Sequence, residues 1–145
     1  MIKAAFCDDD LSVLNELHVL MDNYRVERNQ EITYTAFHSP LELIAQIEKG
    51  MRFDILFLDV LMPGVNRIET AQEIREYDSA MKIIFLTSSA EYAVESYTVN
   101  AYFYQLKPIW PESFYRLMDS VLKECAQEQR RSLILRCKSG ITQIS

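Results

Sequence analysis

A small set of side chains suited to chemistry follows the short apolar runs of this sequence: Asp8, Asp9, Asp10, Asp59, Thr87 and Lys107. If those runs are strands of one parallel sheet, their carboxyl ends meet at the edge where open α/β sheets bind ligands. Carboxylates gathered at that edge repel one another unless a cation lies among them. We therefore expect a hard divalent ion with oxygen ligands, Mg²⁺ above all.

The same residues suit phosphoryl transfer. Asp59 can act as a nucleophile toward a phosphoryl group, because carboxylates form acyl phosphates. Lys107 supplies an opposing positive charge, and Thr87 supplies a short hydroxyl donor for a phosphoryl oxygen. A nucleotide or flavin site is disfavoured, because such a site needs a loop whose amides cradle phosphate after the first strand, whereas Asp8–Asp10 would repel phosphate.

Five short apolar runs are predicted to be the strands that position these residues: Ile2–Cys7, Ile32–Phe37, Phe53–Leu58, Ile83–Leu86 and Ala101–Tyr104. The third and fourth are continuously apolar, as expected of strands buried on both faces. Apolar residues at helical spacing between and after the strands predict five helices, in segments that start near Val13, Leu41, Ile68, Ala90 and Phe114. Ser39-Pro40 is typical of a helix start, and Gly50 of a helix end.

Strict alternation of strands and helices favours right-handed crossovers between parallel strands. The predicted fold class is α/β, a doubly wound five-stranded parallel sheet with helices on both faces, over residues 1–129. Residues 130–145 differ, because Ser132–Cys137 and Ile141–Ile144 flank a Lys-Ser-Gly turn and so predict a β-hairpin tail. Since a lone hairpin is marginal in water, we interpret 130–145 as a linker and the start of a truncated output domain.

The composition fits one globular domain and excludes several other classes of protein. The 145 residues are 49% apolar and 25% charged, and their net charge of −6 disfavours binding of this fragment to DNA. The 3 cysteines, Cys7, Cys125 and Cys137, form no close pair that would predict a disulfide framework or a zinc site. We expect no signal peptide and no transmembrane helix, and a cytoplasmic location.

Four motifs occur in order along the chain: Phe6-Cys7-Asp8-Asp9-Asp10, Leu58-Asp59-Val60-Leu61-Met62-Pro63, Phe85-Leu86-Thr87-Ser88 and Tyr104-Gln105-Leu106-Lys107-Pro108. Together they resemble the receiver domain of bacterial two-component response regulators, over about residues 1–128. The resemblance implies a flavodoxin-like receiver fold. It also implies a Mg²⁺-dependent protein that is not an enzyme, accepts a phosphoryl group from a sensor histidine kinase, and switches an output such as transcription.

The resemblance also implies a role for each matching residue. At the acidic end it makes Asp59 the phosphoacceptor, Asp9 a direct metal ligand and Asp8 a ligand mainly through water, with the Leu61 backbone carbonyl completing the metal shell. In the switch it makes Thr87 the hydroxyl, Tyr104 the aromatic residue and Lys107 the partner of the phosphate. Asp10 is expected to be the N-cap of the first helix rather than a ligand.

Two further features bear on the output and the switch. The tail from Leu133 to Ile141 resembles the opening strands of LytTR-type DNA-binding domains, so DNA would be bound only through a missing C-terminal domain. A tyrosine-rich stretch over the fourth helix, the fifth strand and the start of the fifth helix is a candidate homodimer surface. Arg67 stands where the family usually has glycine and would cost about 1 kcal/mol if that position needs a positive φ.

Two other functions stay open on the residues. A metal-dependent phosphatase with an aspartyl-phosphate intermediate would carry a second acid two residues after its nucleophile, and here that position is Leu61. A phosphorylation-independent interaction module is disfavoured by the presence together of Asp9, Asp59, Thr87 and Lys107, although Arg67 leaves it open.

Overall fold

The computed structural model of the chain describes residues 1–62 and 65–140, with side chains described for 1–60 and 68–137. Its main sheet has five strands in the order β2-β1-β3-β6-β7, and all neighbouring pairs are parallel. The strands are β1 (Ile2–Cys7), β2 (Ile32–Phe37), β3 (Ile55–Leu58), β6 (Lys82–Thr87) and β7 (Phe103–Leu106). The strand order reverses between β1 and β3, where doubly wound sheets bind ligands.

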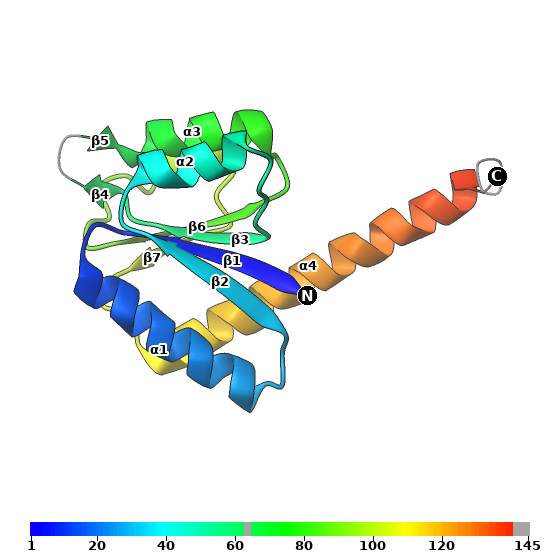
Figure 1. Ribbon diagram of the computed structural model, residues 1–145, viewed down its shortest axis with the longest axis horizontal. Coiled ribbons are helices and arrows are strands. Elements are labelled where there is room, and N and C mark those ends of the chain that lie inside the picture. The colour runs from blue at the N-terminus through cyan, green and yellow to red at the C-terminus, as the bar shows by residue number, and fades with distance from the viewer. Residues whose placement is uncertain (63–64, 141–145) are drawn as a thin grey trace. The chain divides into compact units, whose positions relative to one another are not determined.

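Helices lie on both faces of this sheet, as the sequence predicts. Figure 1 shows α1 (Leu11–Glu27) on one face, and α2 (Pro40–Glu48) and α3 (Arg67–Tyr77) on the other. One large apolar cluster joins α2 and α3 to the strands and includes Leu43, Ile74 and Phe85, each fully buried. Among the helices of the described residues, none has both the length and the apolar character needed to cross a membrane.

Local sequence signals set the start of the first two helices. The Asp10 side chain accepts a hydrogen bond from the Ser12 backbone N–H and caps α1. The Ser39 side chain accepts from the Leu41 N–H in the same way, and Pro40 occupies the first turn of α2. Gly50 has a φ of 103°, a left-handed conformation that favours glycine, just past the end of α2. These caps confirm the predicted helix boundaries.

The register of the sheet brings the predicted site residues to one edge. Cys7 of β1 pairs with Leu58 of β3, so Asp8 and Asp59 follow directly opposed positions on neighbouring strands. The Asp59 N–H donates to the Cys7 carbonyl at 3.1 Å, which carries the pairing past the strand ends. The Lys107 N–H donates to the Thr87 carbonyl at 2.7 Å and does the same for β6 and β7.

Two connections differ from the predicted pattern. After β3 the chain forms a small antiparallel pair, β4 (Leu61–Met62) with β5 (Val65–Asn66), before α3 begins. The α-helix predicted at 90–97 is wrong, because turns there precede a short 3₁₀ helix, η1 (Glu95–Val99). The next residue, Asn100, has a left-handed φ of 53°. A segment this short gains little from helical hydrogen bonds alone, so its tertiary contacts decide its form.

The expected hairpin tail is also corrected. Ser132–Cys137 lie inside α4 (Pro111–Gly140), so the first predicted strand is helical, and the second, Ile141–Ile144, lies outside the described residues. The boundary predicted at 129/130 falls within the same helix. By its contacts the chain divides into two compact units, residues 1–111 and a second unit that begins at Glu112. All the predicted site residues lie in the first unit.

Candidate functional site

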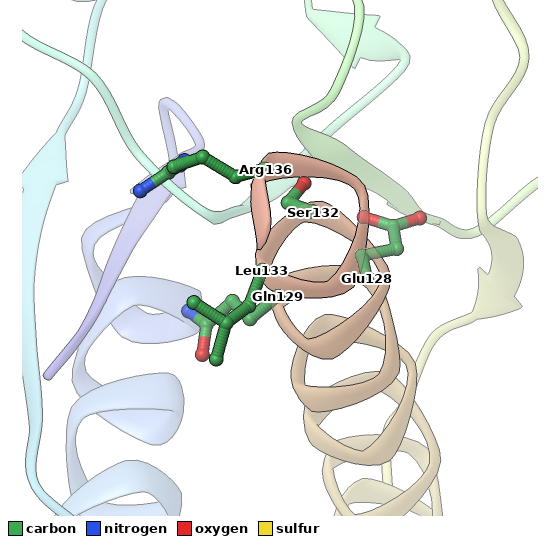
Figure 2. A pocket seen from close by; sticks show the side chains of 5 residues that line it. All are labelled: Glu128, Gln129, Ser132, Leu133 and Arg136. Atoms are coloured by element: carbon green, nitrogen blue, oxygen red, sulfur yellow. The ribbon is translucent and has the colours of Figure 1, made fainter. Parts of the chain in front are cut away.

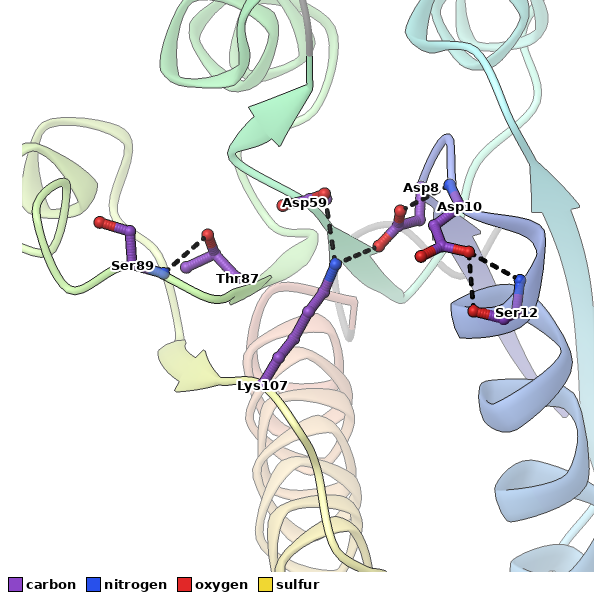
Figure 3. Close-up of polar contacts among 7 residues, drawn as sticks. All are labelled: Asp8, Asp10, Ser12, Asp59, Thr87, Ser89 and Lys107. Atoms are coloured by element: carbon purple, nitrogen blue, oxygen red, sulfur yellow. Dashed lines mark hydrogen bonds and ion pairs between the residues drawn. The ribbon is translucent and has the colours of Figure 1, made fainter.

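Two buried carboxylates and one lysine form the centre of the site. The side chains of Asp8 and Asp59 are almost fully buried, with 2% and 4% of each residue exposed. The Lys107 ammonium donates to Asp8 Oδ2 at 2.9 Å and to Asp59 Oδ2 at 3.3 Å, as Figure 3 shows. Strands β1 and β3 supply the acids, and the residue that follows β7 supplies the base. The sheet edge therefore holds an ion triad with an excess of negative charge.

The surroundings of Lys107 favour its charged, protonated form. Burial lowers the pKa of Lys107, but the hydrogen bond to Asp8 and the charges of Asp59 and Asp8 outweigh it, so the pKa is raised above its ordinary value. Asp8 is fixed from its other side as well, because its Oδ1 accepts from the Asp10 N–H at 2.9 Å. Both groups are thus held in place by contacts within the protein.

A third carboxylate, Asp9, completes a set of metal ligands. Asp8, Asp9 and Asp59 each offer an oxygen, and these atoms lie within 4.8 Å of one another. Asp9 is exposed, whereas the other two are buried. The donor set is all oxygen and carries more negative charge than Lys107 neutralises, which fits Mg²⁺ better than a softer metal.

Asp10 is an N-cap, as its position predicts. Its carboxylate accepts from the Ser12 hydroxyl at 2.7 Å and from the Ser12 N–H at 2.9 Å (Figure 3). Both hydrogen bonds lower the pKa of Asp10 below its ordinary value, and the one from the Ser12 hydroxyl has the larger effect. Its oxygens are directed to the helix terminus, so the third aspartate of the run serves the fold of α1.

Thr87, Ser89 and Tyr104 form a second group at the ends of β6 and β7. Thr87 is fully buried, and its Oγ1 accepts from the Ser89 N–H at 3.4 Å. The Tyr104 hydroxyl donates to the Ser89 carbonyl at 2.6 Å, and its ring lies 6.1 Å from that of Phe85. Burial raises the pKa of Tyr104. Ser89 is therefore the link between the predicted switch hydroxyl and the predicted switch aromatic residue.

The structure places Leu61 and Arg67 at the ends of the β4–β5 pair. Leu61 is the first residue of β4, two residues after Asp59, and the role of its carbonyl as a metal ligand stays a prediction. Arg67 is the first residue of α3. The cost expected of a positive φ at this position stays a prediction.

Sequence reasoning missed one well-connected residue, Arg75 of α3. Its guanidinium donates to the backbone carbonyls of Val99 and Asn100 at 2.8 and 3.1 Å. An arginine near a helix end usually indicates a solvated face, and its carbonyl partners lie 24 and 25 positions further along the chain. No local pattern could have identified this contact.

Residues that the structure describes also line surface hollows outside the aspartate cluster. One runs along α4, as Figure 2 shows, and is lined by Glu128, Gln129, Ser132, Leu133 and Arg136. All five come from one helix, so the hollow is a space between neighbouring side chains rather than an enclosed cavity. Another lies between α1 and the strands β1 and β2, where Leu11, His18, Tyr34 and His38 line it. Neither hollow brings together ligand atoms like those of the aspartate cluster.

A comparison with protein families decides the identity of the domain. Residues 5–121 match the family described as "response regulator receiver domain". The chain belongs to this family. The matched range contains the three clustered aspartates, the buried threonine and the lysine, so the site described above lies within the receiver domain.

Curated relatives of this receiver domain include regulators from several bacteria. The sensory transduction protein LytT of Oceanobacillus iheyensis is 36% identical over 80 residues, 54% of this chain and 32% of the relative. The transcriptional regulatory protein YpdB of Escherichia coli K12 is 31% identical over 104 residues, 66% of this chain and 42% of the relative. NatR of Bacillus subtilis is 25% identical over 135 residues, 93% and 56% of the two chains. The receiver domain thus spans only about a third to just over half of these proteins.

Solved structures confirm the fold of the receiver domain. The response regulatory domain of mrkE from Klebsiella pneumoniae superposes with a TM-score of 0.77 at 22% identity, covering 87% of this chain and 99% of that chain. A CheY-like receiver domain from Methanospirillum hungatei gives a TM-score of 0.74 at 23% identity and covers 88% and 98%. The predicted five-stranded doubly wound architecture is therefore confirmed.

Proposed function

We propose that this receiver domain accepts a phosphoryl group on Asp59 from a phosphohistidine of a sensor histidine kinase, in a Mg²⁺-dependent reaction, and thereby switches an output. The observation that carries the proposal is the buried Asp59 carboxylate, which shares one lysine with Asp8 at the end of β3. A buried, oriented carboxylate beside a fixed cation is suited to an attack on phosphorus.

The proposed transfer needs no reactant other than Asp59, the phosphohistidine and a proton from solvent. An oxygen lone pair of Asp59 forms the new O–P bond as the P–N bond of the phosphohistidine breaks. The electron pair of that bond returns to the imidazole nitrogen, which takes a proton from solvent. Lys107 already lies 3.3 Å from Asp59 Oδ2 and can turn to the incoming phosphoryl oxygens without leaving the site. Fixed positive charge of this kind is what phosphoryl transfer requires.

The acidic residues support the metal part of the proposal. Asp9 and Asp59 would hold Mg²⁺ directly together with the Leu61 carbonyl, and Asp8 would do so mainly through water. Bound Mg²⁺ would neutralise charge on the phosphoryl oxygens. Asp9 suits entry of the ion because it is the exposed member of the set. Thr87 would donate its hydroxyl to a phosphoryl oxygen once phosphate is present.

The proposed domain is a switch rather than an enzyme. Hydrolysis of an aspartyl phosphate as a catalytic cycle needs a nearby acid for the leaving group, and the residue two after Asp59 is Leu61, which has no proton to give. A phosphorylation-independent interaction module would have no need for the lysine shared by two buried carboxylates. The two alternatives are thus less well supported by this site.

The proposed output is transcription, through a LytTR-type DNA-binding domain. Support comes from the names of the relatives, a sensory transduction protein and two transcriptional regulatory proteins. Each of these is about twice to three times as long as the part that this chain matches. The net charge of −6 fits a domain that does not itself contact DNA.

Intact mass spectrometry tests the proposal. The protein is treated with a small phosphodonor such as acetyl phosphate, with and without Mg²⁺. We expect the wild type to gain one phosphoryl group only with Mg²⁺, and Asp59→Asn to gain none. Asp54→Asn is a matched control, because Asp54 lies at the opposite end of the sheet, where its side chain accepts from the Lys3 N–H.

Two results would contradict the assignment. Equal labelling of the wild type and Asp59→Asn would show that another residue is the acceptor. A wild type that gains no phosphoryl group from any donor, including a phosphorylated histidine kinase, would favour the phosphorylation-independent module.

A further inference from the structure

The segment between β6 and β7 is held at two separate points. At its start, Ser89 is bonded to Thr87 and Tyr104, as described above. At its end, Val99 is 2% exposed within the core cluster, and the Arg75 guanidinium binds the carbonyls of Val99 and Asn100. Between these points the side chains of Val94 and Tyr97 project into solvent, 77% and 84% exposed.

Arg75 makes an unusually complete contact for a helix-surface residue. Nε donates to Val99 O at 2.8 Å, Nη2 to Asn100 O at 3.1 Å, and Nη1 to Asp78 O at 3.2 Å. The carbonyls at the end of a helix have no partner within it, and here one planar guanidinium satisfies two of them. Burial lowers the pKa of this guanidinium, while the nearby Asp78 opposes that effect. The end of η1 is thus fastened to the end of α3.

Helix α3 connects this contact to the acidic site by a short path. The chain runs from Asp59 through the β4–β5 pair into α3, which begins eight residues later. Buried Ile68, Ala71 and Ile74 hold α3 in the same apolar cluster as Val99. A shift of the backbone at Asp59 would therefore move both the start of α3 and, through a packed helix, the guanidinium at its end.

We infer that Arg75 is a positioning residue for the switch. It fixes the end of η1, so that a rearrangement at Thr87 and Tyr104 changes the conformation of the exposed Val94–Tyr97 segment. This inference rests on the proposed function of Asp59. Without the contact, both ends of the segment can move. A change in the hydrogen bonds of Ser89 is then absorbed by small backbone shifts within the loop. With the contact, only the part between Ser89 and Tyr97 moves. Coupling requires such an element with two discrete arrangements.

Hydrogen exchange on the whole chain, with and without phosphorylation, tests the inference. Arg75→Gln removes the positive charge and the planar pair of N–H donors. Arg75→Lys keeps the charge but lacks the planar pair of donors. Arg52→Gln is the matched control, because Arg52 Nη1 also donates to two backbone carbonyls near a helix end, those of Ile47 and Met51, both at 2.9 Å. Intact mass measures phosphorylation of every sample.

In the unphosphorylated protein we expect the amides of Asn100 and Ala101 to exchange about tenfold faster in Arg75→Gln than in the wild type. On phosphorylation, the wild type should change its exchange over residues 89–97. Arg75→Gln should lose more than half of that change although Asp59 is labelled to the same extent. Arg75→Lys should fall between the two, and Arg52→Gln should match the wild type.

The outcomes separate this inference from the proposed function. If Arg75→Gln is phosphorylated and retains the full response over 89–97, Arg75 only supports the fold and the inference is wrong, whether or not its resting exchange rises. A similar loss of response in Arg52→Gln would contradict it too, since any helix-end arginine would then have the same effect. A wild type that gains no phosphoryl group overturns the proposed function itself.

Discussion

Lys107 has to neutralise two carboxylates that are almost entirely removed from water. One ammonium near two buried carboxylates leaves a net negative charge, and the exposed Asp9 adds to it. Uncompensated buried charge is costly, because ions lose hydration that pairing only partly restores. The resting site is therefore expected to gain stability from any small cation that the three acids can share.

Mg²⁺ should accordingly stabilise the folded domain even without phosphate. At about a hundred times its dissociation constant, a ligand bound only by the native state adds about 2.7 kcal/mol to the free energy of unfolding. We expect urea unfolding of the wild type to show a gain of this order, and Asp9→Asn to lose most of it. Asp54→Asn should keep the gain. An equal Mg²⁺ effect on Asp9→Asn and the wild type would exclude Asp9 as a ligand.

Ser89 should set the lifetime of the phosphorylated state. It is small and uncharged, so it neither blocks an attacking water nor orients one, and an intermediate lifetime is expected. Ser89→Tyr should slow dephosphorylation by covering the approach to Asp59. Ser88→Tyr, at the exposed neighbouring position, should leave the rate unchanged. Loss of the label can be followed by intact mass after the donor is removed, and identical kinetics in all three proteins would show that residue 89 does not control water access.

Hydrogen bonds among Thr87, Ser89 and Tyr104 link the end of β6 to the end of β7. A phosphoryl oxygen on Asp59 would draw the Thr87 hydroxyl toward it and release the Ser89 N–H. The Tyr104 hydroxyl, now bonded to the Ser89 carbonyl, would be freed to change position. The two arrangements are expected to differ by only a few kcal/mol, so that phosphorylation can shift their populations.

Thr87→Ala should separate phosphorylation from switching. The nucleophile, the acidic ligands and Lys107 remain, so we expect the variant to be phosphorylated like the wild type. Its association constant for itself or for a partner should not change on phosphorylation, whereas a coupled wild type should change about 5- to 150-fold. Mass spectrometry and sedimentation on the same samples measure the two properties. A full wild-type shift in Thr87→Ala would leave the proposed coupling without support.

All five strands of the main sheet were predicted, and the bounds of β1 and β2 agree with the prediction to the residue. The continuous apolar runs identify β3 and β6, whose ends lie within two residues of those predicted. The edge strand β7 was placed two residues too early, because its apolar run ends at Tyr104, whereas the polar Gln105 still pairs with Leu86 of β6. The convergence of Asp8, Asp59 and Lys107 followed from their strand ends, whereas Arg75 did not, since its partners are backbone atoms that any sequence provides.

The tail shows where a pattern is ambiguous. Leu133, Ile134 and Leu135 form a short apolar run, and such a run fits a strand or a helix equally well. In the structure these three side chains are exposed on α4. Extending a helix that has already formed costs far less than nucleating one, so the run continues the helix.

The first unit as a whole exposes large apolar side chains close together in sequence near β7: Val94, Tyr97, Phe103, Leu106 and Trp110. We propose that phosphorylation promotes a homodimer through these exposed residues, since aromatic residues are enriched at interfaces. Tyr97→Glu should weaken the phosphorylated dimer by at least about tenfold, as the loss of an aromatic anchor typically does. Val26→Glu, a change at a similarly exposed apolar residue of α1, should not. Sedimentation velocity distinguishes the two, and equal weakening would point to a general effect of charge.

The ion triad also has a consequence for synthesis, because Lys107 and its partner Asp8 are 99 positions apart in sequence. A growing chain makes its acidic residues early but acquires the neutralising lysine only after β7 has been translated. Until then the aspartates at the ends of β1 and β3 cannot be buried together without a counter-charge. If Asp59 is the phosphoacceptor, a nascent chain acquires its complete site only when nearly all of the sheet has been made.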